Sequence, residues 1–189
     1  TPLDSDTKLL LHFNGTMGGT DTTDFSPADH TADIVFMGNA HINTSESKFG
    51  GSALKLDGTG DYLNISESDE WDFGSGDFTV ELWFRTNNFA AKTHNLLDNQ
   101  DTSGLNGWQL RLSATPAFNW QSQTGSTDYQ IDTSTITIVD GTWYHIAVVR
   151  NGNTQVVYFD GMSIGNESFS GSQGASSDPL LIGRDSNNA

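Results

Sequence analysis

The chain has 189 residues, no cysteine and a formal net charge of −16, from 24 acidic and 8 basic side chains. The absence of cysteine excludes disulfides, a thiolate nucleophile and a Cys-based zinc site. The negative charge argues against binding to nucleic acid or to an anionic membrane surface. The length suits a single domain, and without a run of about 18 apolar residues we expect no membrane insertion.

The predicted elements are short strands separated by turns rich in Gly, Asn and Asp. An apolar run over residues 7–13 predicts a buried first strand, and residues 16–33 form a long polar loop that is a candidate functional or metal-holding loop. Further strands are predicted over residues 34–37, 40–42, 53–56, 62–65, 78–85, 95–98, 107–113, 117–121, 129–131, 136–139, 143–150, 155–159 and 180–183. No window of about ten residues shows helical periodicity, so the pattern predicts an all-β sandwich or barrel.

The clearest local pattern spans residues 141–164. Two runs rich in β-branched and aromatic residues are separated by Asn151-Gly152, and Asp160-Gly161 follows the second run. Both dipeptides tolerate the positive φ angles of tight hairpin turns. This stretch therefore predicts three antiparallel strands in a meander.

Residues 78–85 alternate between two sets of side chains. The set predicted to face the core consists of Phe78, Val80, Leu82 and Phe84. The opposite face carries Trp83 between Glu81 and Arg85. Either Trp83 packs on the sheet with a Glu81–Arg85 pair beside it, or it is a platform for a ligand; we favour the first interpretation.

Several segments together resemble the laminin-G-like family of the concanavalin A-like lectin/glucanase superfamily. They follow the family's order over residues 10–15, 24–26, 49–58, 61–63, 78–85, 143–150, 158–161 and 181–184. The resemblance implies a jelly-roll sandwich of two antiparallel sheets, one of them concave. Members of the family usually close with a strand after the Ile-Gly-Arg element, and here the chain ends first. We therefore expect residues 1–189 to be one domain that lacks its closing strand and belongs to a longer protein.

Some segments, for example residues 47–51 and 72–78, are similar in sequence to domains of this family in phage and marine bacterial surface proteins. This likeness implies an extracellular protein of a cell surface or a virion, such as a tail fibre. The expected function is adhesion to a glycan or a cell-surface polysaccharide. The alternative is a structural or assembly domain of a virion or fibre that contacts other protein subunits and binds no sugar.

No catalytic pair of carboxylates is predicted. Glycoside hydrolases share the fold that the resemblance implies, and they use two carboxyl groups across the scissile bond. The carboxylate cluster at residues 67–70 follows a strand instead of forming one, and Glu81 is a single strand carboxylate beside an aromatic residue. His145 lies in the family's Trp-Tyr-His strand and is interpreted as a packed structural histidine. We therefore expect no enzyme activity.

A sugar site needs an aromatic ring flanked by side chains that bond hydroxyl groups. The best local match is Trp120 with Asn119 and Gln121, and Tyr129 and Arg111 are further candidates. For Trp120 itself, ligand contact and core packing both remain open.

Calcium is a possible structural ion, because Ca²⁺ takes oxygen ligands from carboxylates and loop carbonyls. The resemblance points to the loop with Asp24 and Ser26, together with backbone carbonyls near residues 50–53. The loop over residues 57–61 is a second candidate, although its Asp-Gly pairs equally suit plain turns. The acidity of the chain has an alternative explanation, which is solubility.

Overall fold

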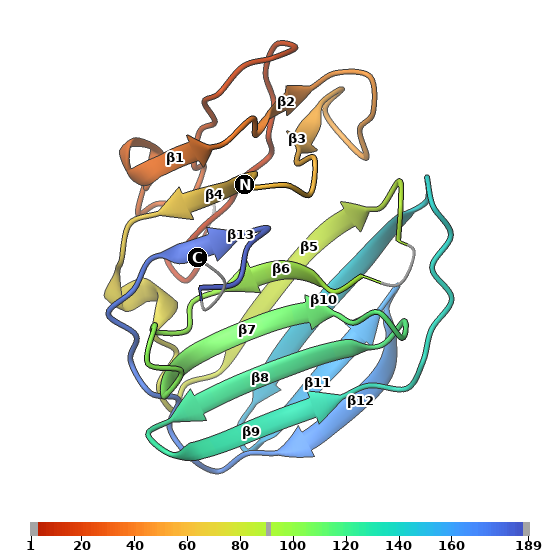
Figure 1. The fold of residues 1–189 in the computed structure, drawn as a ribbon. Coiled ribbons are helices and arrows are strands. Elements are labelled where there is room, and N and C mark those ends of the chain that lie inside the picture. The colour runs from red at the N-terminus through yellow and green to blue at the C-terminus, as the bar shows by residue number, and fades with distance from the viewer. Residues whose placement is uncertain (1–3, 90–91, 187–189) are drawn as a thin grey trace.

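Two antiparallel sheets, packed face to face, make up most of the structure, a computed structural model that describes residues 4–89 and 92–186. In Figure 1, strands β6 to β9 lie in front of the second sheet. The larger sheet has the order β1-β4-β13-β6-β7-β8-β9. Its strands are β1 (Ile34–Met37), β4 (Tyr62–Ile65), β6 (His94–Asp98), β7 (Asn106–Leu112), β8 (Phe118–Thr124), β9 (Thr127–Asp132) and β13 (Leu180–Ile182). The predicted all-β fold of two antiparallel sheets is confirmed.

The smaller sheet contains the predicted meander and has the order β12-β11-β10-β5. Its strands are β5 (Phe78–Arg85), β10 (Trp143–Asn151), β11 (Thr154–Phe159) and β12 (Met162–Ser168). Asp160 and Gly161 join β11 to β12 with φ angles of 46° and 80°, as a type I′ turn requires. The first turn lies one residue later than predicted, because Asn151 pairs with Thr154.

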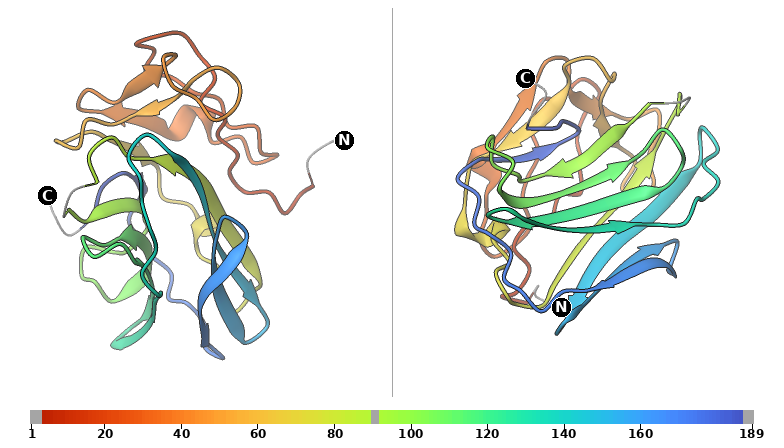
Figure 2. Two further views of the ribbon diagram at one scale, coloured as in Figure 1. Left: turned by 90° about the vertical axis from the view of Figure 1, so that its right-hand side faces the viewer. Right: turned by 60° about the horizontal axis from the view of Figure 1, so that its bottom comes forward.

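Strand β13 joins parts of the chain that are far apart in sequence. Leu180 pairs with Ile65 of β4, and Leu181 pairs with Asp98 of β6. The seven-stranded sheet is therefore continuous only because a C-terminal strand lies between an N-terminal strand and a central one. The short β2 (His41–Asn43) and β3 (Ala53–Lys55) pair with each other, and this N-terminal part covers one end of the sandwich (Figure 2).

The core between the sheets is built largely from aromatic rings. Trp108 and Trp120 of the larger sheet lie 5.4 Å apart, centroid to centroid, and Phe78 of the smaller sheet lies 5.7 Å from Trp120. Phe84 is buried, as the alternation of β5 predicts. Burial of such large rings contributes a large share of the hydrophobic stabilisation, because each removes ~150–250 Å² from water.

The prediction of a first strand over residues 7–13 is wrong. Among the described residues, this segment forms only an isolated bridge between Leu11 and Asp24. Phe13 has a φ of 53°, which takes the backbone out of the extended region. The backbone N–H of Leu10 bonds to the side chain of Asp24, so a side chain takes the place of a neighbouring strand. Leu9 and Leu11 still pack against the core.

The predicted strand over residues 136–139 is also not formed, although Ile136 packs against the core and its N–H bonds to the carbonyl of Pro116. The structure adds two single-turn 3₁₀ helices, η1 (Thr31–Asp33) and η2 (Asp69–Trp71). In the described part of the chain, no helix is long and apolar enough to cross a membrane.

Candidate functional site

The residues predicted to bind sugar lie on both sides of the larger sheet. Trp120 faces the core and is fully buried, and its indole N–H donates to Gln155 Oε1 of the opposite sheet at 2.7 Å. Tyr129 is on the same inner side, with its ring 4.2 Å from that of Phe169. This corrects the prediction for Trp120, because a ring buried between two sheets has no face for a sugar. The cause is the alternation of a strand, which turns Trp120 away from both of its neighbours.

Asn119, Gln121 and Arg111 point to the outer side of the larger sheet. One row there joins Arg111, Asn119 and Asp132. The Arg111 guanidinium donates to Asn119 Oδ1 at 2.8 Å, and the Asn119 amide donates to Asp132 Oδ1 at 2.8 Å. Gln130 donates to the other oxygen of Asp132 at 2.6 Å.

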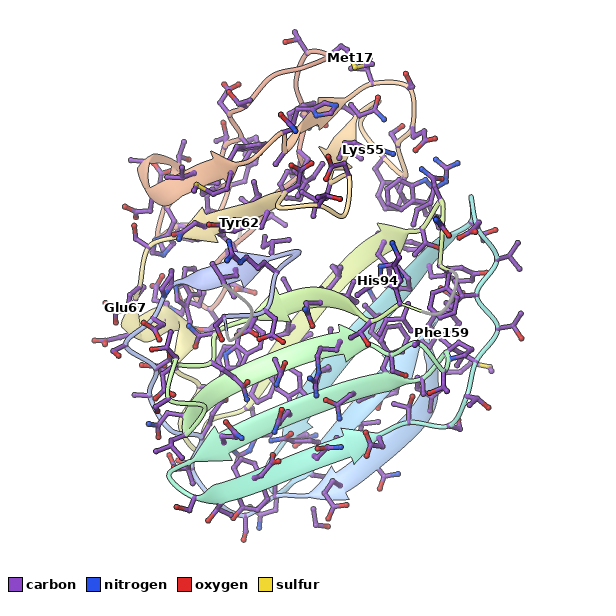
Figure 3. The ribbon with its side chains drawn as sticks, viewed as in Figure 1. Met17, Lys55, Tyr62, Glu67, His94 and Phe159 are labelled. Carbon is purple, nitrogen blue, oxygen red and sulfur yellow. The ribbon has the colours of Figure 1, made fainter. Side chains whose placement is uncertain are left out.

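A second row on this outer side runs beside the first and contains residues that the sequence reasoning missed. Gln109 donates to Gln100 Oε1 at 2.7 Å and also to Gln121 Oε1. The Gln121 amide donates to Asp128 Oδ2 at 2.8 Å. We name this side of the sheet the polar face; it consists of Gln109, Arg111, Asn119, Gln121, Asp128, Gln130 and Asp132, of which Gln109 and Asn119 are buried. The outer side of β7 to β9 is turned toward the viewer in Figure 3. Strand register could have found the polar face, because paired residues of adjacent strands share a side.

The polar face continues into a buried carboxylate at β6. Asp98 lies opposite Gln109 in the pairing of β6 with β7, and its side chain is fully buried. It accepts the backbone N–H of Gln100 at 2.7 Å and that of Ser186 at 3.3 Å. Burial raises the pKa of Asp98 to about 6, against the effect of these hydrogen bonds.

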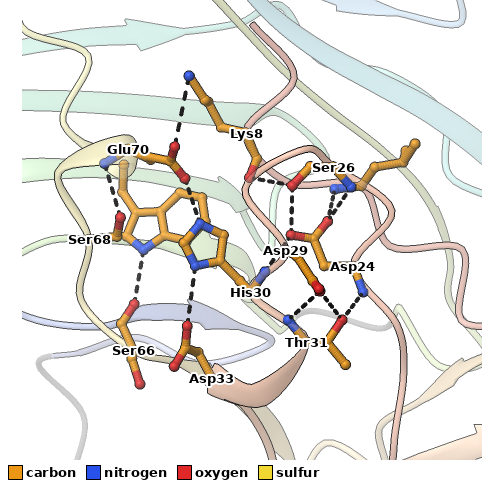
Figure 4. Close-up of polar contacts among 12 residues, drawn as sticks. Lys8, Asp24, Ser26, Asp29, His30, Thr31, Asp33, Ser66, Ser68 and Glu70 are labelled. Atoms are coloured by element: carbon orange, nitrogen blue, oxygen red, sulfur yellow. Dashed lines mark hydrogen bonds and ion pairs between the residues drawn. The ribbon is translucent and has the colours of Figure 1, made fainter. Parts of the chain in front are cut away.

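The predicted calcium residue Asp24 is surrounded by hydrogen-bond donors (Figure 4). Its Oδ1 accepts the backbone N–H groups of Leu10 and Ser26, each at 2.9 Å. Its Oδ2 accepts the Ser26 hydroxyl at 2.7 Å and the backbone N–H of His30 at 2.9 Å. Burial works against the charged form, but these bonds outweigh it and lower the pKa of Asp24.

The surroundings of Asp24 do not fit a cation, because its two carboxylate oxygens already accept hydrogen bonds from four N–H and O–H groups. The Ser26 hydroxyl lies 2.7 Å from Asp24 Oδ2 and 3.0 Å from the carbonyl oxygen of Lys8, so it ties this loop to the N-terminal segment. In the part of the chain that the structure describes, no group of three or more His, Cys, Asp or Glu side chains could hold a metal ion. Calcium binding at this loop stays a prediction, and the arrangement explains Asp24 and Ser26 as residues that hold the N-terminal segment.

The loop over residues 57–61 has the geometry of a turn. Asp61 accepts the backbone N–H of Asn39 at 2.5 Å and that of Asp57 at 2.9 Å. Asp57 in turn accepts the N–H of Thr59 at 2.7 Å. These carboxylates are used to fix the backbone, which is the plain-turn interpretation of the Asp-Gly pairs.

The polar loop over residues 16–33 is anchored by His30, a residue that the sequence reasoning left without a role. Its Nε2 lies 2.5 Å from Glu70 Oε2 and its Nδ1 lies 3.3 Å from Asp33 Oδ2 (Figure 4). The ring packs against Trp71, 4.8 Å away. Burial disfavours the charged imidazolium, but the hydrogen bonds to Glu70 and Asp33 outweigh it and raise the pKa of His30.

The outer side of the smaller sheet carries Trp83, which is 37% exposed. The predicted Glu81–Arg85 pair is not formed. Glu81 Oε2 lies 3.3 Å from His145 Nε2, and Arg85 pairs with Glu46 at 2.5 Å. His145 is therefore half-buried on the outer side, beside Trp83, and not packed within the core.

The sequence of this chain matches the model of the concanavalin A-like lectin/glucanases superfamily over residues 57–189, so the chain belongs to that superfamily. The predicted resemblance is confirmed. A search among curated proteins gives no match.

Solved structures with the same fold include binding domains of botulinum neurotoxins and domains of laminin. The binding domain of botulinum neurotoxin DC, in complex with SialylT, superposes with a TM-score of 0.67 at 13% identity, over 93% of this chain and 42% of that one. A structure titled for the interaction of botulinum neurotoxin type C with two ganglioside molecules gives 0.61 at 11% identity, over 97% and 50%. Domains LG4-5 of the mouse laminin α1 chain give 0.51 at 18% identity, over 62% and 30%. The chain thus spans half or less of these structures, and the likeness is one of fold.

Proposed function

We propose that this chain is a non-catalytic carbohydrate-binding module of an extracellular, cell-surface or virion protein, such as a tail fibre. Membership of a lectin/glucanase superfamily supports the proposal. So does the fold shared with a neurotoxin that is described as interacting with gangliosides. The observation that carries it is the polar face, in which two hydrogen-bonded rows lie side by side on the outer side of the larger sheet, one with Arg111 and Asn119 and the other with Gln121.

The polar face suits hydroxyl groups because it combines acceptors and donors at neighbouring positions. Asp128, Gln130 and Asp132 are exposed along β9, and Asn119 and Gln121 lie beside them on β8. Carboxylates accept from sugar hydroxyls, whereas amides and the guanidinium also donate. Because the side chains already bond to one another, binding would immobilise few additional rotamers, each of which costs about 0.5–1.5 kcal/mol.

The exposed carboxylates of this face support binding without hydrolysis. Asp128 and Asp132 are four residues apart on β9, which places them about 13 Å apart along the strand. The carboxyl pair of an inverting glycosidase is ~6.5–9.5 Å apart, and that of a retaining one is ~5–5.5 Å apart.

The test is a glycan array with the wild-type protein and a variant carrying Asn119→Ala and Gln121→Ala. We expect binding to at least one glycan class, and at least tenfold weaker binding in the variant. Asn166→Ala is the matched control, because Asn166 is an exposed carboxamide on β12 of the other sheet. Equal binding by all three proteins would overturn the polar face as the site, and no binding by the wild-type protein would overturn the function.

The alternative is a structural or assembly domain that contacts other protein subunits of a virion or fibre. One observation favours it: among the described residues, β5 pairs only with β10 and is an edge of the smaller sheet. The open side of an edge strand can pair with a strand of another chain. Analytical ultracentrifugation distinguishes the two functions. A concentration-independent monomer that binds glycans supports the first, and a defined oligomer without glycan affinity supports the second.

A further inference from the structure

A group of aromatic side chains stands exposed on the outer side of the smaller sheet, on the opposite side of the sandwich from the polar face. We name it the outer aromatic cluster; it consists of Phe49, Trp83 and His145 together with Lys48. Phe49 is 65% exposed and Trp83 is 37% exposed. Exposed apolar surface of this kind costs free energy at about 25 cal/mol per Å² and commonly marks a binding site.

The rings of the outer aromatic cluster are arranged around Trp83. Phe49 meets Trp83 edge-on, with centroids 5.6 Å apart and planes at 88°. The ring of His145, which is the β-pairing partner of Trp83 across β5 and β10, lies 5.2 Å from the ring of Trp83. A hollow of about 430 Å³ opens beside these rings, lined by Lys48, Trp83, Trp143, His145 and Asp160.

The polar groups of the hollow are held in place by the fold. Asp160 Oδ1 accepts the backbone N–H of His145 at 2.8 Å, in the type I′ turn between β11 and β12. On the side of His145, Glu81 Oε2 lies 3.3 Å from the imidazole Nε2. An apolar ring flanked by fixed carboxylates and an imidazole is the combination that recognises the C–H and O–H groups of a pyranose.

Lys48 indicates the charge of the ligand. Its ammonium lies 4.0 Å from the centroid of the Trp83 ring and 5.7 Å from that of Phe49. Among the described residues, no carboxylate lies within 4.0 Å of this ammonium. The neighbouring cation Arg85 is already paired with Glu46. In a chain of net charge −16, Lys48 is thus a cation held by aromatic faces and not by an anion.

We propose that the outer aromatic cluster binds a carboxylated saccharide, with a sugar ring stacked on Trp83 and the sugar carboxylate paired with Lys48. A stacked sugar takes the position that the ammonium now occupies over the ring, so the ammonium needs a new partner. A carboxylate is a stronger partner for an ammonium than a hydroxyl, because the attraction between opposite charges adds to the hydrogen bond. The inference rests on the proposed carbohydrate-binding function but places a ligand on a different surface.

The test is calorimetric titration of the wild-type protein at physiological salt with two matched pairs of ligands. The pairs are sialyllactose with lactose and oligogalacturonate with galacto-oligosaccharide, so the two sources of a sugar carboxylate are separated. We expect binding of at least one carboxylated ligand and at least tenfold weaker binding of its neutral counterpart. Trp83→Ala should weaken the carboxylated ligand at least tenfold. Lys48→Met, which keeps the alkyl chain, should reduce its affinity to that of the neutral ligand.

Phe25→Ala is the matched control, because Phe25 is 47% exposed and its ring stacks only on His12 among the described aromatic residues. It should leave all affinities unchanged, and thermal melts should show that every variant is folded. Equal affinity for carboxylated and neutral ligands, or unchanged affinity in Trp83→Ala, would overturn the inference. If glycan binding depends on Asn119 and Gln121 but not on Trp83, this site fails while the proposed function stands.

Discussion

Trp120 and Trp83 are both mid-strand tryptophans, and they lie in opposite environments. Trp120 of β8 is fully buried between the sheets, whereas Trp83 of β5 is 37% exposed on an outer side. Their neighbours in sequence explain the difference. Trp120 stands between Asn119 and Gln121, so the polar residues take the outer side and the ring faces inward.

Trp83 stands between Leu82 and Phe84, and these apolar neighbours take the inner side. On a strand, therefore, polar neighbours do not indicate that an aromatic residue is exposed; they indicate that it is buried. A sugar site assembled from residues 119 to 121 combines side chains that a strand must separate. The exposed ring is the one whose neighbours are apolar.

The largest expected effect is the loss of protein stability when one of the two tryptophans is replaced by alanine. Trp120→Ala should lower the free energy of unfolding by about 3–5 kcal/mol, because it leaves a cavity in the core and a buried Gln155 without its donor. Trp83→Ala should lower it by roughly 1 kcal/mol or less, since the ring is partly in water. Urea unfolding measures both values. Similar losses in the two variants would mean that Trp83 is a structural residue, against its proposed role as a ligand platform.

A smaller change in the free energy of unfolding is expected when the charge of a buried carboxylate or of an exposed one is removed. Asp98 is fully buried with a pKa raised to about 6, from an ordinary value of 3.8, whereas Asp132 is exposed in the same sheet. Since the folded state holds the Asp98 proton more tightly, this residue destabilises the protein most above pH 6, and the penalty is relieved as the pH falls from 6 towards 4. A pKa shift of this size lowers the free energy of unfolding at neutral pH by about 2–3 kcal/mol.

Asp98→Asn should therefore be more stable relative to the wild-type protein at pH 7.5 than at pH 4.5, as measured by urea unfolding at both values. Asp132→Asn is the matched control for the loss of one charge, and its stability relative to the wild type should change little over this range. A constant difference between Asp98→Asn and the wild type would show that Asp98 is ionised in a solvated setting.

The smallest effect concerns the stability contributed by a histidine that pairs with a glutamate beside a tryptophan. The described part of the chain has two such groups, one of His30 and Glu70 beside the buried Trp71 and one of His145 and Glu81 beside the exposed Trp83. In the first group Trp71 is buried and the pKa of His30 is raised by Glu70 and Asp33. The ion pair therefore stabilises the fold fully below the unfolded pKa of about 6.5 and is lost as the pH rises through the folded pKa.

His30→Gln should thus remove a stabilisation of about 1 kcal/mol at pH 5.5 and less at pH 8.5. Glu70→Gln should give the same pH dependence, and Glu167→Gln, an exposed carboxylate on β12, controls for the change in net charge. Thermal melts at the two pH values measure the difference. A pH dependence that is identical in His30→Gln and in the wild type would assign the anchoring of the N-terminal loop to other contacts.

The parts of the structure that could be predicted depend on local patterns. The meander followed from its two turn dipeptides, because Gly152, Asp160 and Gly161 have the positive φ angles of tight turns, although Asn151 itself is the last residue of β10. The core side of β5 followed from its alternation. Residues 7–13 looked equally apolar, but their backbone bonds to a side chain, Asp24, and an apolar run carries no information about its hydrogen-bond partner.

The candidate sites were predicted less well, because they depend on contacts between distant parts of the chain. His30 and Glu70 are 40 residues apart, and Asp98 and Ser186 are 88 apart. Nothing in either local sequence indicates the pairing. The outer aromatic cluster likewise brings Lys48 from a loop to Trp83 of β5. Alternation predicts which side of a strand a residue takes, and only the assembled fold shows what it meets there.

The position of β13 has a consequence for the synthesis of the protein. Because β13 separates β4 from β6, the N-terminal pair of β1 and β4 has no strand pairing with the rest of the larger sheet until Ile182 has emerged from the ribosome. The meander and strands β6 to β9 pair with near neighbours in sequence and can form while the chain is still being made. Docking of β13 is therefore the step that joins β1 and β4 to the rest of the larger sheet.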